Sequence, residues 1–155
     1  MDPLDEKEDY EIVHVLQTLG IWQKFIIGVA EGEKTGLSYK IENDSKNLSQ
    51  GEKQLLCMGR AMLHKNKLIL LDEATANIDV ITEAKIQRTI TENFGDSTVL
   101  MIAHRLNTIM FCDKILVLEN GKKLEYDDLN TLKKNPQSVF RKMLDVNEDI
   151  KDYIK

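Results

Sequence analysis

The sequence predicts an α/β fold with a mostly parallel sheet flanked by helices. Three short aliphatic runs, at residues 68–71, 98–102 and 114–118, have the length and composition of strands. The segments between them include amphipathic stretches of helical length, such as residues 79–93. Because parallel strands end at the same edge of a sheet, we expect ligand-binding residues directly after these runs.

Composition places the chain among ordinary soluble globular proteins. Its 155 residues suffice for one domain with a core, and 42% are hydrophobic and 30% charged. The net charge of -5 argues against a duplex-DNA partner. No apolar run approaches the roughly 18 residues of a membrane helix, and the acidic start is not a signal peptide. Cys57 and Cys112 lack metal-ligand spacing, so we expect buried free thiols.

The first half of the chain is predicted to begin with a helix and a loop. Apolar residues between positions 9 and 19 have helical spacing, and Gly20 is the expected stop. Residues 28–47 mix glycines with charges and are expected to form a loop. Residues 32–36 contain the letters of a phosphate-binding loop in the wrong order, and no stretch of the sequence matches the P-loop pattern.

Two capped helices and a core strand are predicted next. Ser49 and Glu52 have the spacing of a capping box, which predicts a helix from there to about residue 64. The strand at 68–72 is expected to be buried on both faces and to carry Asp72 and Glu73 at its end. Asp79 is the expected cap of a helix that reaches about residue 93.

The second half continues the alternation of strands and helices. A strand at 98–102 is followed by His104 and a short helix at 106–111. A third strand at 114–118 is joined by a predicted Asn120-Gly121 turn to an antiparallel strand at 122–126. Two helices, from Asp127 or Asp128 to 134 and from 137 to about 144, precede a charged tail.

The polar residues at these element ends together suit nucleoside triphosphate hydrolysis. A helix start such as the one at Ser49 presents N–H groups that favour phosphate. An aspartate at a strand edge, Asp72, can hold Mg²⁺, and the adjacent Glu73 can take a proton from an attacking water. His104 can sense or position a terminal phosphate. Positioning and electrostatic stabilisation are what phosphoryl transfer needs.

These segments closely resemble the motifs of the ATP-binding cassette family. Residues 48–54 resemble its signature motif, 68–73 its Walker B strand, 76–79 its D-loop and 102–106 its switch-histidine loop. The N-terminal residues 1–4 and the helix at 12–19 resemble the multidrug-resistance-associated (C) subfamily of exporters. The resemblance implies ATP and Mg²⁺ as cofactors in the intact domain.

The resemblance also assigns roles by position. It implies that Asp72 supports Mg²⁺, that Glu73 is the general base and that His104 contacts the γ-phosphate. Contacts with the ATP of a partner domain, or a place at the dimer seam, are implied for five further residues: Ser49, Gln50, Gly51, Glu52 and Asp79. The bland interpretation of Ser49 and Asp79 is that they are helix caps only.

The resemblance implies that residues 1–155 are the C-terminal part of one nucleotide-binding domain. Its parts are a signature-helix region at about 9–65, a region from Walker B to the C-terminal helices at about 66–145, and a charged tail at 146–155. On this interpretation we expect the Walker A, adenine-stacking and Q-loop segments to be absent from these residues. We therefore expect the isolated chain to be soluble, to bind Mg-ATP weakly or not at all, and to self-associate through an exposed sheet edge.

In the intact protein, the expected partners are a second nucleotide-binding domain and a transmembrane domain, at the cytoplasmic face of a membrane and without nucleic acid. One departure is Glu52, which stands where the family commonly has glutamine and adds negative charge unless the capping box turns it inward. Two alternatives stay open. Residues 51–53 resemble chromosome-maintenance and DNA-repair ATPases, although no heptad coiled coil flanks them. The chain can also be a non-catalytic interaction half-domain.

Overall fold

The computed structural model describes residues 1–2, 6–27, 36–42, 46–74, 78–102 and 105–146. They belong to two compact units, Met1–Leu100 and Met101–Lys155. His104, residues 76–77 of the predicted D-loop and most of the predicted tail lie outside the described residues. The predicted boundary between residues 65 and 66 separates two groups of motifs rather than two compact units. It stays a prediction.

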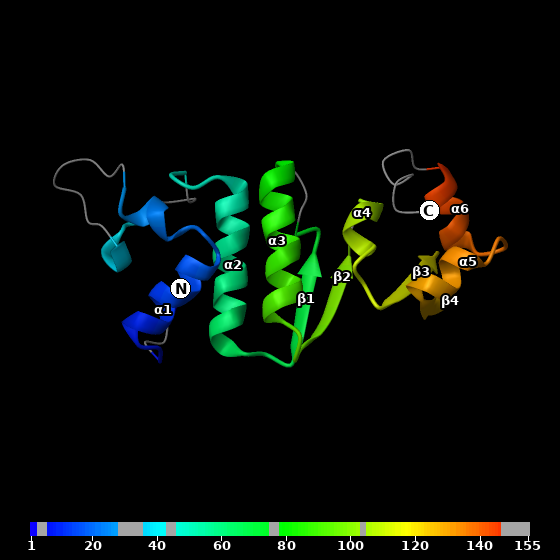
Figure 1. Cartoon of the computed structure of the whole chain (residues 1–155), viewed down its shortest axis with the longest axis horizontal. Helices are drawn as coiled ribbons and strands as arrows, with labels where there is room; N and C mark the ends of the chain where they lie inside the picture. The colour runs from blue at the N-terminus through cyan, green and yellow to red at the C-terminus, as the bar shows by residue number, and fades with distance from the viewer. Residues whose placement is uncertain (3–5, 28–35, 43–45, 75–77, 103–104, 147–155) are drawn as a thin grey trace. The chain divides into compact units, whose positions relative to one another are not determined.

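The first unit contains the predicted helices at nearly their expected bounds (Figure 1). Its elements are α1 (Asp9–Thr18), η1 (Trp22–Phe25), η2 (Gly36–Ser38), α2 (Gln50–His64), β1 (Leu68–Asp72) and α3 (Val80–Asn93). The strand β2 (Thr98–Ile102) begins in this unit. Gly20 follows α1 with a φ of 66°, the left-handed conformation that ends helices most easily at glycine.

The core of this unit lies where α1, α2 and α3 pack. Ile86 of α3 is fully buried, and Leu16 and Leu55 are 3% exposed. Gly59 allows α1 to approach α2 closely, because a Cβ there would lie 2.9 Å from Leu19 Cδ1 and 3.2 Å from Val15 Cγ1. A glycine in the middle of α2 is therefore explained by helix packing rather than by a turn.

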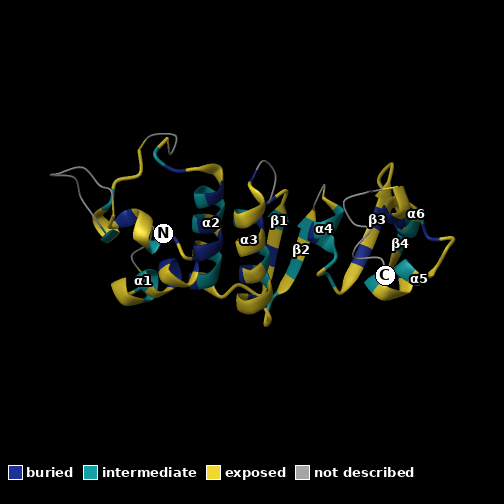
Figure 2. Ribbon diagram, turned by 45° about the horizontal axis from the view of Figure 1, so that its top comes forward, coloured by how far each residue is buried: buried dark blue, intermediate teal, exposed yellow. Residues whose placement is uncertain are grey.

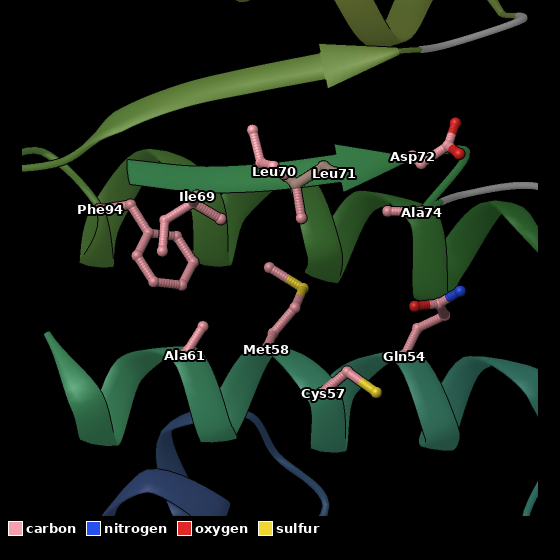
Figure 3. A pocket seen from close by; sticks show the side chains of 10 residues that line it. All are labelled: Gln54, Cys57, Met58, Ala61, Ile69, Leu70, Leu71, Asp72, Ala74 and Phe94. Atoms are coloured by element: carbon pink, nitrogen blue, oxygen red, sulfur yellow. The ribbon is translucent and has the colours of Figure 1, made fainter. Parts of the chain in front are cut away.

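The strand β1 pairs with β2, and the two arrows run in the same direction (Figure 1). The prediction that this strand is buried on both faces is wrong. Ile69 is 6% exposed, whereas Leu68 and Leu70 are 57% and 67% exposed. Figure 2 colours the ribbon of each element by burial class, β1 included. Figure 3 shows the reason: Ile69 and Leu71 point toward α2 and Leu70 points the other way, where the described residues of the unit place no helix. Covering one face gives alternating burial.

The second unit is a hairpin packed against helices. Its elements are α4 (Leu106–Ile109), β3 (Lys114–Glu119), β4 (Lys122–Asp128), α5 (Leu129–Lys134) and α6 (Val139–Val146). Asn120 and Gly121 have φ angles of 50° and 73°, as the predicted turn requires, and β3 pairs antiparallel with β4. Phe140 and Leu144 of α6 are at most 1% exposed and pack with Ile115 of β3.

The fold class is thus α/β in the described residues, but the single, mostly parallel sheet is not confirmed. The described strands form two sheets of two strands each, β1-β2 and β3-β4. The prediction of buried thiols is wrong for Cys57, which is exposed, while Cys112 is half-buried; both are free. Cys57 is one of the residues that line a hollow between α2 and β1 (Figure 3).

Glu125 of β4 fixes the start of α6. Its carboxylate accepts hydrogen bonds from the Val139 N–H at 2.8 Å, the Phe140 N–H at 3.0 Å and the Ser138 hydroxyl at 2.9 Å. Burial opposes ionisation of this carboxyl, but the three donors hold the pKa of Glu125 below its usual value. The hairpin thereby caps a helix that begins more than ten residues further along the chain.

Candidate functional site

The start of α2 has the predicted capping box. Ser49 is extended, with φ -68° and ψ 163°, and its hydroxyl oxygen accepts a hydrogen bond from the Glu52 N–H at 3.2 Å. In return, a carboxylate oxygen of Glu52 accepts one from the Ser49 N–H at 2.7 Å. The hydroxyl acts here as an acceptor, so its proton can still be donated to an anion.

Glu52 is turned back toward its own unit rather than away from it. One carboxylate oxygen bonds to the Ser49 backbone, and the other lies 3.6 Å from the ammonium of Lys24 in η1. The Glu52 side chain is only 24% exposed. The negative charge that departs from the family's usual motif is therefore offset by a lysine. Sequence reasoning missed Lys24, because no local signal links it to Glu52.

Gly51 lies directly against α3. It is buried, and a Cβ placed on it would be 2.5 Å from Thr82 Cγ2, closer than two carbon atoms can approach. At the start of α3, Asp79 is the predicted N-cap and accepts a hydrogen bond from the Thr82 N–H at 3.0 Å. That bond, first among its causes, holds the pKa of Asp79 below its usual value. Thr82 thus contacts both predicted site residues.

Asp72 and Glu73 lie together at the carboxyl end of β1. Both are exposed. Glu73 has a φ of 49°, the left-handed region that costs a non-glycine residue about 1–2 kcal/mol. The chain therefore turns sharply at Glu73. Ala74, which follows Glu73, is buried. Backbone strain of this kind often accompanies functional residues.

A hollow of about 210 Å³ lies between α2 and β1. Asp72 and Gln54 lie at one end of it, and Phe94 and Ala61 at the other (Figure 3). Its remaining lining residues are Cys57, Met58, Ile69, Leu70, Leu71 and Ala74. The lining is mostly apolar, which suits a packing partner better than a phosphate group.

The donor set fits Mg²⁺ held jointly by protein, phosphate and water. Within the described ranges, no cluster of three or more His, Cys, Asp or Glu residues could hold a metal ion by itself. Magnesium is usually bound by one or two carboxylates together with substrate phosphates, and Asp72 offers one such carboxylate. His104 lies outside the described residues. The structure thus brings Gly51 and Asp79 together through Thr82, and Asp72 and Glu73 through the end of β1.

Known proteins resemble this chain over most of its length. The model of the family described as ABC transporter matches residues 5–76. The chain belongs to the ATP-binding cassette transporter family. Within that family it resembles subfamily C, the multidrug-resistance-associated transporters.

Three relatives illustrate this similarity. The chain is 44% identical over 140 residues to ATP-binding cassette transporter abc2 of Schizosaccharomyces pombe. This match covers 90% of this chain and 9% of the relative. It is 42% identical to human ATP-binding cassette sub-family C member 4 and 43% identical to multidrug resistance protein mrp-7 of Caenorhabditis elegans. Each of these two matches spans 144 residues and 93% of this chain, and 10% and 9% of the respective relative. The chain therefore spans about a tenth of the length of these relatives. No helix in the described residues is long and apolar enough to cross a bilayer.

Proposed function

We propose that this chain is the C-terminal part of the ATP-hydrolysing domain of an exporter of the C subfamily. The observation that carries the proposal is the end of β1, where Asp72 is followed by Glu73 in a strained, left-handed conformation. The proposal rests equally on the family membership, because a strand that ends in two carboxylates is not specific by itself. In the intact protein, ATP binding and hydrolysis by this domain would be coupled to transport.

Asp72 and Glu73 would act on nucleotide held within the same domain. Bound Mg-ATP would supply the phosphoryl group and a cation that neutralises its charge. The Asp72 carboxylate would hold that cation directly or through water. The exposed Glu73 carboxylate would accept a proton from the attacking water, and His104 would donate to the γ-phosphate.

The start of α2 would act on nucleotide held by a second domain. The Ser49 hydroxyl and the N–H groups of Gln50 and Gly51 would donate to its γ-phosphate, since first-turn N–H groups have no acceptor within their own helix. Glu52 would stay turned toward Lys24 and leave that path to phosphate open. Asp79 would lie at the seam between the domains.

The proposed partners are a second nucleotide-binding domain and a transmembrane domain, at the cytoplasmic face of a membrane and without nucleic acid. We further propose that the 155 residues alone bind Mg-ATP weakly or not at all and do not hydrolyse it, because no stretch of them matches the P-loop pattern. The exposed Leu68 and Leu70 support the proposed tendency to self-associate.

The test is an ATP-dependent association measured by sedimentation. The purified chain is mixed with a complete nucleotide-binding domain of human sub-family C member 4, with and without Mg-ATP. We expect a complex only with Mg-ATP, lost in Ser49→Arg and retained in the control Thr131→Arg, which adds the same charge at an exposed position on α5. Association without ATP, or none at all, would contradict the proposal.

Calorimetry separates the second part of the proposal from the first. We expect no saturable heat when the chain alone is titrated with Mg-ATP. ATP turnover by the chain alone that disappears in Glu73→Gln would overturn the expectation of an inactive segment.

A further inference from the structure

We propose that Thr82 is a positioning residue that locks the start of α2 at Gly51 to the start of α3 at Asp79, so that the two helix starts behave as one rigid corner. Its functional meaning rests on the function proposed above, in which both helix starts face the nucleotide of a partner domain. The contacts that carry it lie within the first unit and do not depend on that function.

The side chain of Thr82 leaves no room for a side chain at position 51. A Cβ on Gly51 would lie 2.5 Å from Thr82 Cγ2, 3.3 Å from Thr82 Cβ and 3.4 Å from Thr82 Oγ1. Threonine is branched at Cβ and has few χ1 alternatives in a helix, so Thr82 cannot easily turn away. Any residue larger than glycine at position 51 must therefore displace Thr82 itself.

The backbone of Thr82 holds Asp79. The Thr82 N–H donates to Asp79 Oδ1 at 3.0 Å, and the Glu83 N–H donates to the Asp79 carbonyl at 2.9 Å. The turn is anchored on both sides, since Ile78 is 6% exposed and Ile86 is fully buried. A displaced Thr82 would therefore lengthen its bond to the Asp79 carboxylate rather than carry the whole turn along.

The consequence for the proposed site is a fixed relation between three groups. The N–H of Gly51 and the hydroxyl of Ser49 belong to the same capped turn, and Asp79 belongs to the adjoining one. If a partner's phosphate engages the first turn, the Thr82 contact places Asp79 at a set position toward that partner. Gly51 is thus required for packing as well as for access of phosphate to the backbone.

The experiment is a double-mutant cycle on the full 155-residue chain. Gly51→Ala introduces the clash, Thr82→Ser removes Cγ2 but keeps the N–H, and the double variant combines them. Gly95→Ala is the matched control, because a Cβ there meets nothing within 4 Å. The readouts are the urea midpoint and the titration of the Asp79 carboxyl followed by NMR.

We expect Gly51→Ala to lower the urea midpoint by about 1 M and to raise the Asp79 pKa toward its ordinary value. The double variant should recover at least half of both changes, and Gly95→Ala should alter neither. The titration is needed because a purely structural clash would lower the midpoint and leave Asp79 unchanged. If Gly51→Ala does not fold, a folded double variant in which the pKa of Asp79 stays below its ordinary value supports the proposal, and a folded double variant in which that pKa is ordinary overturns it.

The proposal would be overturned if adding Thr82→Ser to Gly51→Ala restored neither the urea midpoint nor the Asp79 pKa. Neither readout uses ATP. The double-mutant cycle can therefore contradict the role of Thr82 while ATP-dependent association still supports the proposed function. Equally, the association assay can contradict the proposed function while the cycle still supports the role of Thr82. In the association assay, the proposal predicts that the double variant recovers partner binding that Gly51→Ala has lost. If Gly51→Ala loses partner binding and the added Thr82→Ser change does not restore it, Gly51 would act through phosphate contact alone.

Discussion

Removing the Glu125 carboxylate should selectively destabilise the second unit. In Glu125→Ala, the N–H groups of Val139 and Phe140 and the hydroxyl of Ser138 lose their shared acceptor. The loss matters because Ser138 is fully buried and Phe140 is 1% exposed, so both depend on a correctly placed start of α6.

The magnitude follows from the cost of losing a helix cap. Replacing a capping acceptor with alanine costs typically about 1 kcal/mol and up to about 2. A charged acceptor with three donors belongs at the upper end, although water entering the vacated space replaces part of the loss. With an m-value of about 2 kcal/mol/M in urea, a loss of about 1.5 kcal/mol lowers the midpoint by roughly 0.75 M.

The same carboxylate makes stability depend on pH in a defined direction. Since the pKa of Glu125 is lower in the folded chain, its contribution is fully present above the unfolded value of about 4.3 and is lost as pH falls through the folded value. The difference in unfolding free energy between the parent chain and Glu125→Gln should therefore shrink as the pH falls below about 4.3.

The assay is urea unfolding followed by circular dichroism at several pH values. Glu119→Ala is the control, because this exposed glutamate is in the same hairpin and its replacement should change stability by no more than about 0.5 kcal/mol. Equal losses of unfolding free energy in Glu125→Ala and Glu119→Ala would refute the reasoning. So would a stability difference between the parent chain and Glu125→Gln that does not change with pH.

Three further changes test the packing and the site. Ser49→Ala should cost about 1 kcal/mol in urea unfolding, and Ser49→Thr much less, because threonine retains the capping hydroxyl; equal costs would count against the capping box. Lys24→Met should destabilise by at most about 1 kcal/mol at low salt, and the effect should vanish in a Glu52→Gln background and at high salt; a loss that persists in that background would disprove the pairing. Leu144→Ala should cost about 2–5 kcal/mol because this leucine is fully buried, whereas Val146→Ala, 84% exposed on the same helix, should be nearly neutral.

Local chemistry was sufficient to predict most elements of this chain. Ser49 and Asp79 identify the helix starts because the capping bond reaches only three residues ahead, and the structure contains both bonds. Asn120 and Gly121 identify the hairpin because both tolerate a positive φ. The order and spacing of the motifs around Ser49, Asp72 and Asp79 identified the family without any tertiary information.

Tertiary structure decided the features that depend on what covers an element. Leu68 and Leu70 read as buried because sequence shows how apolar a strand is and not how many of its faces find a partner. The contacts of Lys24 with Glu52, of Thr82 with Gly51 and of Glu125 with the start of α6 join residues 13 to 31 positions apart. No periodicity or capping rule reaches that far, so these contacts exist only because packing brings the residues together.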